Sequence, residues 1–337
     1  MSAPLQPRMR RRGRHPPRQK QRGVALIIAL VLVALATILA TKLTFDGWIE
    51  QRRTTGVLAA EQAVQFAMGA EALAGDVLSQ QSGTQITLAQ PWAQPTQPLP
   101  LTPENDAEGE PIGTLQAYLE DMQGRFNLNN LARLDSSGKQ DAETLAQFQR
   151  LLVSVGLDAK WAGIARDWID RDDQPGSPDG AEDSVYTSQT PPYRTANWPM
   201  TTATELMNMP GFTGDMYRKI APYVTALPTM TAAINICTAP ALVIESLAPG
   251  LSGEYSRSPE VLVEARKTGC FPTVPTLTTI MTQAVASKIT GRFLDSSTYF
   301  RLTTRVTLGT TEFTLYSLLS RSTGGKVSPL LRTFGTI

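Results

Sequence analysis

The sequence predicts an α+β protein in which a long N-terminal helix and an antiparallel sheet are combined with a large inserted α-helical domain. Three observations support this prediction. An apolar run near the N-terminus continues into a proline-free amphipathic stretch, strand-like alternation occurs in two distant parts of the chain, and helical periodicity fills the region between them. The 337 residues suffice for two folded units, and we expect the second unit to interrupt the first.

The first expected element is a single helix over residues 24–81. It opens with VALIIALVLVALATILA, a run without any charge, which at about 1.5 Å per residue covers roughly 26 Å of a ~30 Å hydrocarbon core. Residues 1–23 before it form a basic leader with eight Lys and Arg residues and no acidic one. Because such positive charge stays in the cytoplasm, we expect one membrane pass with the body of the chain outside. That body is acidic.

Alternating apolar and polar residues predict the strands of the sheet domain. Gly113–Glu120 and Arg125–Leu128 are expected to form a hairpin, which belongs to the first part of this domain over residues 82–128. The second part, residues 286–337, is expected to form an antiparallel meander of three strands, Thr298–Leu308, Glu312–Leu319 and Lys326–Phe334.

Residues 129–285 are expected to form the inserted helical domain. A weak internal repeat, in which Phe126–Asn130 is echoed by Ile234–Thr238, predicts two helical subdomains of SAM-like or helix-hairpin-helix-like type. Helix-hairpin-helix modules can hold DNA phosphates, but phosphate binding needs clustered Lys and Arg. The Pro-Gly turns of this region are flanked mainly by acidic residues, so nucleic-acid binding is not expected.

Histidine and cysteine are too scarce for several kinds of site. The only histidine, His15, lies in the basic leader, so a chain cut after the leader could form neither a Ser-His-Asp nor a Cys-His system, and no His-ligated zinc site. Cys237 and Cys270 are the only cysteines. In an oxidising compartment they would most simply form one disulfide; the alternative is two unpaired buried thiols.

The position of Gly23, between the leader and the apolar run, bears on processing. A secretory signal peptide would be cut after the run, yet the nearest A-x-A-like site, Ala34–Ala36, lies inside it. The arrangement instead resembles a type IV prepilin peptidase site, where cleavage between Gly23 and Val24 would keep the helix in the mature chain.

The fifth residue after that cleavage point is Ile28, where most pilins carry a glutamate that neutralises the N-terminal ammonium of a neighbouring subunit. A buried unpaired ammonium is costly, so a subunit without this acid is suited to the last place in a filament. In this departure, and in its large size, the chain resembles the K-type minor pseudopilins of type II secretion, the GspK family.

This resemblance implies a pilin-like fold and a non-enzymatic role at the tip of a pseudopilus, where the protein would support assembly and the export of folded exoproteins. It further implies an inner-membrane location with the body in the periplasm. The implied partners are prepilin peptidase, the minor pseudopilins I and J, the major pseudopilin filament, and the secretin and exoprotein substrates. Two alternatives stay open: a signal-anchored periplasmic enzyme with a carboxylate loop, and a minor pilin of type IV pili or DNA uptake.

An acidic loop is the one site-like feature of the body. Residues 170–183 read DRDDQPGSPDGAED, with six carboxylates and a single basic residue, Arg171. Like charges at this density raise one another's pKa unless they are solvated or bind a cation. A D-x-D pair and two glycines that allow a tight return would bring four ligands together, namely Asp170, Asp172, Glu182 and Asp183, with Asp173 and Asp179 as weaker candidates.

Oxygen ligands without His or Cys select a hard cation, and outside the cytoplasm calcium is favoured over magnesium. From the residues alone a solvated acidic loop is the alternative. The resemblance to the GspK family, which binds calcium in this region, favours calcium. A second site could draw on Asn197 and Glu205. Acid and base catalysis by paired carboxylates is not expected, because a Pro/Gly-rich loop lacks the apolar setting that separates their pKa values.

Overall fold

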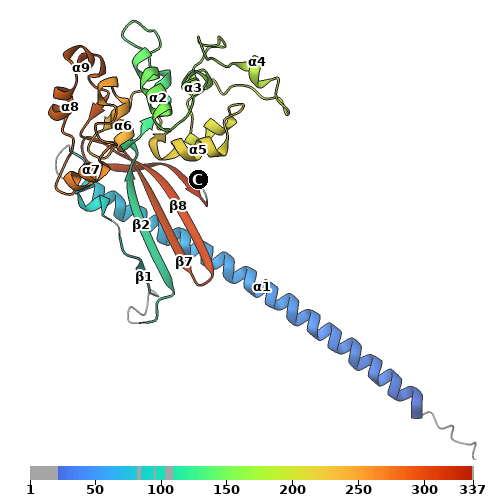
Figure 1. Ribbon diagram of the computed structural model, residues 1–337. Helices are drawn as coiled ribbons and strands as arrows, with labels where there is room; N and C mark the ends of the chain where they lie inside the picture. The colour runs from blue at the N-terminus through green and yellow to red at the C-terminus, as the bar shows by residue number, and fades with distance from the viewer. Residues whose placement is uncertain (1–21, 82–84, 95, 103–108, 336–337) are drawn as a thin grey trace, which may run out of the picture. The chain divides into compact units, whose positions relative to one another are not determined.

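The computed structural model describes residues 22–81, 85–94, 96–102 and 109–335 (Figure 1). The expected basic leader, except for its last two residues, lies outside the described residues. The chain divides into two compact units, residues 1–58 and residues 59–337, and each is described by itself.

Helix α1 begins at the end of the leader and spans Arg22–Ser79. Its part in the first unit contains a candidate membrane span, by length and composition, with a mean hydropathy of 2.9 over its most apolar window. The large apolar side chains from Val24 to Leu43 are all more than half exposed. The expected long N-terminal helix is thus confirmed.

The second unit contains a five-stranded sheet in the order β1-β2-β7-β8-β9, with all neighbours antiparallel. The strand bounds are β1 Leu99–Leu101, β2 Gly113–Asp121, β7 Tyr299–Leu308, β8 Thr311–Arg321 and β9 Val327–Phe334. Strands β7, β8 and β9 form the expected C-terminal meander, which is confirmed. A short 3-10 helix, Pro91–Ala93, precedes β1.

The second half of α1 packs on this sheet through small side chains. The residues buried along it are spaced three or four apart, as one helix face requires: Ala63, Ala67, Ala70, Ala74 and Leu78. Glu71 on the same face accepts hydrogen bonds from Ser317 of β8 and from both Nε and Nη2 of Arg332 of β9. The hydrogen bond from Arg332 and the positive charge of this side chain lower the pKa of Glu71. Through these hydrogen bonds the carboxylate fixes the helix to two strands.

The expected hairpin between Gly113–Glu120 and Arg125–Leu128 is wrong. After β2 the chain makes a 3-10 turn, Met122–Gly124, and then the short strand β3, Phe126–Asn127, which pairs in parallel with β4, Val224–Thr225. The antiparallel neighbour of β2 is β7, from far along the sequence. The whole helical domain is therefore inserted in the connection between two neighbouring strands.

The inserted domain lies beyond the ends of β2 and β7, where the chain leaves and re-enters the sheet (Figure 1). Its α-helices are α2 Ala142–Ser154, α3 Trp161–Ile169, α4 Asp183–Tyr186, α5 Gly214–Ile220, α6 Ala241–Ser246, α7 Pro259–Arg266, α8 Val274–Ile280 and α9 Gln283–Ile289. The last of these crosses the boundary expected at residue 285. The domain shares one core, whose largest buried side chains include Phe126, Phe148 and Tyr186.

The internal repeat corresponds to two closed segments. The first begins with β3 and ends with β4; the second begins with β5, Ile234–Asn235, which pairs in parallel with β6, Phe293–Leu294. In each opening strand an asparagine side chain accepts a hydrogen bond from the backbone two residues later: Asn127 from Asn129 N, and Asn235 from Cys237 N. The same local chemistry thus starts both segments.

Two features fix the second segment to the sheet and to itself. The buried carboxylate of Asp121, at the end of β2, accepts hydrogen bonds from the side chains of Asn235, Thr238 and Ser297. Within the segment, Cys237 and Cys270 are joined by a disulfide.

Candidate functional site

The acidic loop begins where helix α3 ends. This helix forms because apolar residues recur on one side of it, and Trp161, Ala165 and Trp168 are buried there. Asp158 accepts a hydrogen bond from Lys160 N in the turn before the helix, and Lys160 is the N-cap residue. Asp170 takes an extended backbone conformation and ends it. The loop therefore starts from a fixed point in the core.

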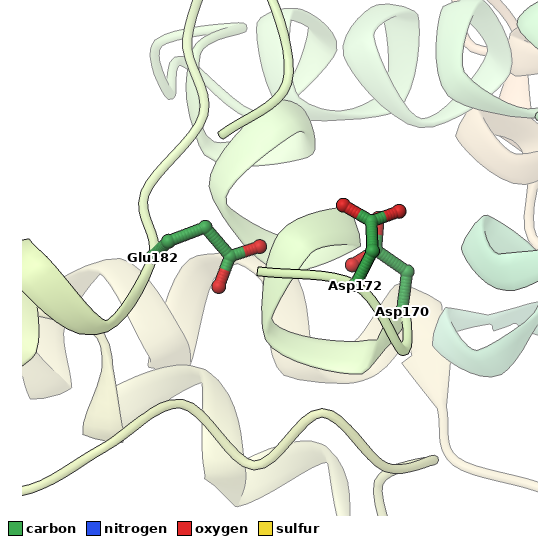
Figure 2. Close-up of side chains that lie close together, drawn as sticks. All are labelled: Asp170, Asp172 and Glu182. Carbon is green, nitrogen blue, oxygen red and sulfur yellow. The ribbon is translucent and has the colours of Figure 1, made fainter. Parts of the chain in front are cut away.

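The loop brings together three of the four expected ligands. One oxygen from each of Asp170, Asp172 and Glu182 lies within 4.8 Å of the others. Figure 2 shows the Glu182 carboxylate pointing toward those of Asp170 and Asp172. Asp170 and Asp172 come from the turn after α3, and Glu182 immediately precedes α4.

Several oxygens of this cluster are buried and unpaired. Glu182 is only 3% exposed, and neither of its carboxylate oxygens has a hydrogen-bond partner in the described chain; the same holds for Oδ1 of Asp170. The other oxygen of Asp170 accepts a hydrogen bond from Gln140 Nε2 at 2.7 Å, and Asp172 Oδ1 accepts one from Gln174 N at 3.0 Å. Buried unpaired carboxylate oxygens are costly, and a bound cation would satisfy them.

Burial and mutual repulsion raise the pKa of two of these groups. For Asp170, burial and then the charges of Asp167 and Asp172 raise the pKa to about 7. For Glu182, burial and then the charges of Asp167 and Asp170 raise the pKa to about 7 as well. Both shifts reflect the cost of holding neighbouring carboxylates together out of water, and a bound cation would relieve this cost.

Asp167, which is not among the residues expected from the sequence, holds the loop in place through hydrogen bonds. Its side chain is fully buried in α3 and pairs with Arg166, while its Oδ2 accepts hydrogen bonds from Gly176 N at 2.8 Å and Ala181 N at 3.0 Å. A Cβ at Gly180 would lie 2.3 Å from Asp167 Oδ2, and one at Gly176 would lie 2.8 Å from Asp167 Oδ1. Close packing on Asp167 thus favours glycine at both positions. The one available signal is an adjacent charged pair within an apolar helix.

The remaining expected ligands lie outside the cluster. Asp183 accepts hydrogen bonds from Thr195 N and Oγ1 at 3.1 and 3.0 Å and pairs with Arg194. Asp173 accepts one from Asn197 Nδ2. Asp179 is exposed, and its backbone packs on Gly163.

The two residues named for a second cation site have different surroundings. Glu205 completes a capping box with Thr202, and its Oε2 accepts a hydrogen bond from Trp168 Nε1 at 3.3 Å. Asn197 keeps a buried unpaired Oδ1 and a left-handed backbone conformation, with φ 44°. The first site is thus the better defined.

The three clustered carboxylates suit calcium. Calcium binds oxygen at 2.3–2.6 Å, so two of its ligands lie at most roughly 5 Å apart. The three oxygens lie within 4.8 Å of one another, and the cluster can therefore accommodate the ion. The donors are all carboxylate oxygens, as hard cations prefer. The residues present therefore fit a calcium ion.

The residues expected to act in processing and assembly lie in the first turns of α1. Gly23 follows the first residue of the helix, and a Cβ at that position would meet nothing within 4 Å. Val24 and Ile28 are 63% and 54% exposed.

Comparison with known proteins gives a consistent set of relatives. The family model described as type II secretion system protein K matches residues 124–229. The chain is 32% identical to type II secretion system protein K of Pseudomonas aeruginosa, with 94% of each chain covered. It is 31% identical to the protein of that name from Pectobacterium carotovorum, over 94% of this chain and 98% of the relative.

The fold is similar to a chain in a solved complex. The crystal structure of the GspK-GspI-GspJ complex from the type 2 secretion system of enterotoxigenic Escherichia coli contains a chain that matches with a TM-score of 0.71 and 25% identity. The match covers 85% of this chain and all of the other.

Proposed function

Because the chain belongs to the protein K family of the type II secretion system, we propose that it is the minor pseudopilin that caps the tip of the secretion pseudopilus. In this role it supports pseudopilus assembly and the export of folded exoproteins across the outer membrane. The body lies in the periplasm, and α1 anchors the chain in the inner membrane.

The observation that carries this proposal is Ile28 in the exposed apolar part of α1. Prepilin peptidase cuts between Gly23 and Val24, which makes Ile28 the fifth residue of the mature chain. An isoleucine offers no charge to the N-terminal ammonium of another subunit, and leaving that ammonium unpaired in an apolar environment is costly. The chain therefore ends a filament and does not continue it.

The solved relative supports the choice of partners. Its structure is a complex of GspK with GspI and GspJ, so we propose that this chain binds the I-type and J-type minor pseudopilins and that together they cap the major pseudopilin filament. At this position the inserted domain is free to meet the secretin and the exoprotein. The role is one of assembly and contact, and involves no catalysis.

Calcium binding to the acidic loop is the second part of the proposal. Asp170, Asp172 and Glu182 hold the ion, which satisfies the buried oxygens of Glu182 and compensates the charges of the three carboxylates. Asp167 positions the loop through its two backbone hydrogen bonds. When bound, calcium supplies structural cross-linking between the end of α3 and the start of α4.

Mass spectrometry of the mature N-terminus tests the pseudopilin assignment. We expect a chain that begins at Val24 when it is isolated from membranes of cells with prepilin peptidase, and an uncut leader when the peptidase gene is deleted. A chain that begins at any other residue in the first strain would overturn the assignment.

Calcium titration of the chelator-treated full-length chain tests the second part separately. We expect the melting temperature to rise with calcium and to respond much less to magnesium. An unchanged melting temperature would remove calcium from the proposal and leave the pseudopilin role standing.

A further inference from the structure

Strand β9 is an edge of the sheet with free backbone groups. Its one sheet neighbour in the described part of the chain is β8. Gly335 N donates to Thr314 O, and the register continues from Leu315 opposite Phe334. Because antiparallel partners alternate between bonded and non-bonded pairs, the backbone N–H and C=O groups of Arg332 and Phe334 point away from β8. A row of this kind accepts another strand.

A groove of about 410 Å³ opens beside this edge, between the sheet and the inserted domain. The sheet contributes Leu318, Leu330 and Leu331, and the inserted domain contributes Trp198 and Met230. Trp198 is 62% exposed, and the two leucines of β9 are each about half exposed. The groove is lined by uncharged residues throughout.

The wall opposite the strand is fixed in place. The side chain of Asn129 donates to Met200 O and accepts from Met200 N, at 2.9 and 2.8 Å. This double contact holds the segment that contains Trp198. On the sheet side, Arg332 is bound by Glu71, so the edge offers no unpaired charge from Leu330 to Phe334. The groove is therefore preformed and neutral.

We propose that β9 and this groove form a docking site for an extended segment of a protein partner, which adds to the sheet as a further strand. The free N–H and C=O groups of β9 require a partner with an extended backbone, because the backbone groups of a helix are already hydrogen-bonded within the helix. The uncharged lining, which includes Asn129, Thr201 and Thr229 beside apolar residues, suits uncharged side chains at every second position of the bound segment. The site goes beyond tip capping and does not depend on calcium.

Pro329 limits where the added strand pairs. Proline lacks a backbone donor, and it lies next to the register shift in β9 that faces Leu318 and Leu319. The useful edge therefore runs from Leu330 to Phe334, which suits a segment of roughly five to eight residues.

A defined peptide tests the site on the full-length chain in lipid nanodiscs. The probe is a fluorescein-labelled peptide of eight alternating valine and threonine residues, and its twin is N-methylated at every second residue. We expect the first peptide to bind in fluorescence anisotropy. The methylated twin should bind at least tenfold more weakly, because its bonding edge is blocked. Equal binding of the two peptides would overturn the proposal.

A matched pair of variants locates the binding. Phe334→Pro and Phe334→Ala both remove the ring, but only the proline also removes the outward N–H. We expect Phe334→Ala to bind the peptide within a few-fold of wild type and Phe334→Pro to lose at least tenfold. Trp198→Ala should also weaken binding. Equal affinity of the two Phe334 variants, or self-association of the wild type that Phe334→Pro abolishes, would overturn the proposal; the second result would make a second copy of this chain the occupant.

Discussion

Glu182 shows how one buried carboxylate defines a site. Neither of its oxygens has a hydrogen-bond partner among the residues that the structure describes, and the side chain is almost fully buried. An ionised group in this position destabilises the chain unless a cation compensates it. The backbone puts it there because Asp167 holds Gly176 and Ala181 by their N–H groups. The calcium proposal thus depends on a residue that binds no metal itself.

Glu182→Gln should abolish the response to calcium. At a calcium concentration 100 times the Kd, the wild type gains about 2.7 kcal/mol of unfolding free energy, and the variant should gain little. Differential scanning calorimetry with calcium and with chelator measures both. Without calcium at pH 8 the variant should be at least as stable as wild type, because it removes a buried charge.

Asp183→Asn is the matched control for this experiment. Asp183 bonds to Thr195 and Arg194 and lies outside the cluster. Its substitution should cost roughly 1 kcal/mol, the usual net value of a hydrogen bond, with and without calcium, and should keep the calcium response. Loss of that response in Asp183→Asn would make it a ligand after all.

The same carboxylates predict a pH dependence. The pKa of Asp170 and of Glu182 is about 7 in the folded chain and near 4 in the unfolded chain. Between these values the folded chain binds more protons, so the unfolding free energy falls as the pH rises from about 4 to about 7. Under the calcium proposal, the bound ion would replace the protons and remove this loss.

Urea unfolding of calcium-free wild type and Glu182→Gln at several pH values measures this effect. Carboxylates with a lowered pKa, such as Glu71, act in the opposite direction in both proteins and cancel in the comparison. We expect the unfolding free energy of Glu182→Gln to increase relative to that of the wild type as the pH rises toward 8. A difference that does not change with pH would contradict the assigned pKa of Glu182.

At the scale of elements, local periodicity predicted the helices and strands that are specified by residues close together in the sequence. The apolar run of α1, the alternation of the C-terminal strands and the helical periodicity of the region between the strands each specify their own element. The face of α1 that packs on the sheet was not predicted, because it consists mainly of alanines. The pairing of β3 was missed because alternation does not name a partner: Phe126 and Asn127 pair with Val224 and Thr225.

The sequence likewise predicted only part of the candidate site. The D-x-D spacing placed Asp170 and Asp172 together, and the two glycines indicated a tight return. The sequence could not distinguish Glu182, which turns inward, from Asp183, which bonds to Thr195. That choice is made by Asp167, whose one signal is its charged neighbour within an apolar helix, and by the contact of Asp183 with Thr195, twelve residues away, which has no local signature.

The disulfide between Cys237 and Cys270 should stabilise the second helical segment. It closes a loop with a sequence separation of 33, for which chain entropy predicts roughly 3–4 kcal/mol. The double variant Cys237→Ala, Cys270→Ala should lose about this much in urea unfolding. Dithiothreitol should lower the unfolding free energy of the wild type by a similar amount and leave that of the double variant unchanged. A loss below about 1 kcal/mol would show that tertiary packing alone holds the segment.

At the scale of the whole molecule, the residues on which the proposed function depends lie in two separate regions. Those proposed for processing and assembly lie in the exposed apolar part of α1, while the acidic loop lies in the inserted domain. The insertion is possible because β2 and β7 are neighbours in the sheet. The segment between them can be long without disturbing the register of the two strands. The hydrogen bonds to Asp121 fix the inserted domain to the end of β2.

Ile28→Glu should change the place of the chain in the filament. The new carboxylate can neutralise the N-terminal ammonium of a further subunit, so the chain no longer has to be the last one. Ile28→Gln is the matched control, since it is also polar and similar in size but carries no charge. Quantitative mass spectrometry of sheared pseudopili should show several-fold more copies of Ile28→Glu per filament, with wild type and Ile28→Gln remaining equal. If Ile28→Glu and Ile28→Gln are present in the same amount, the missing carboxylate is not what ends the filament, and the inserted domain must block further addition by its bulk.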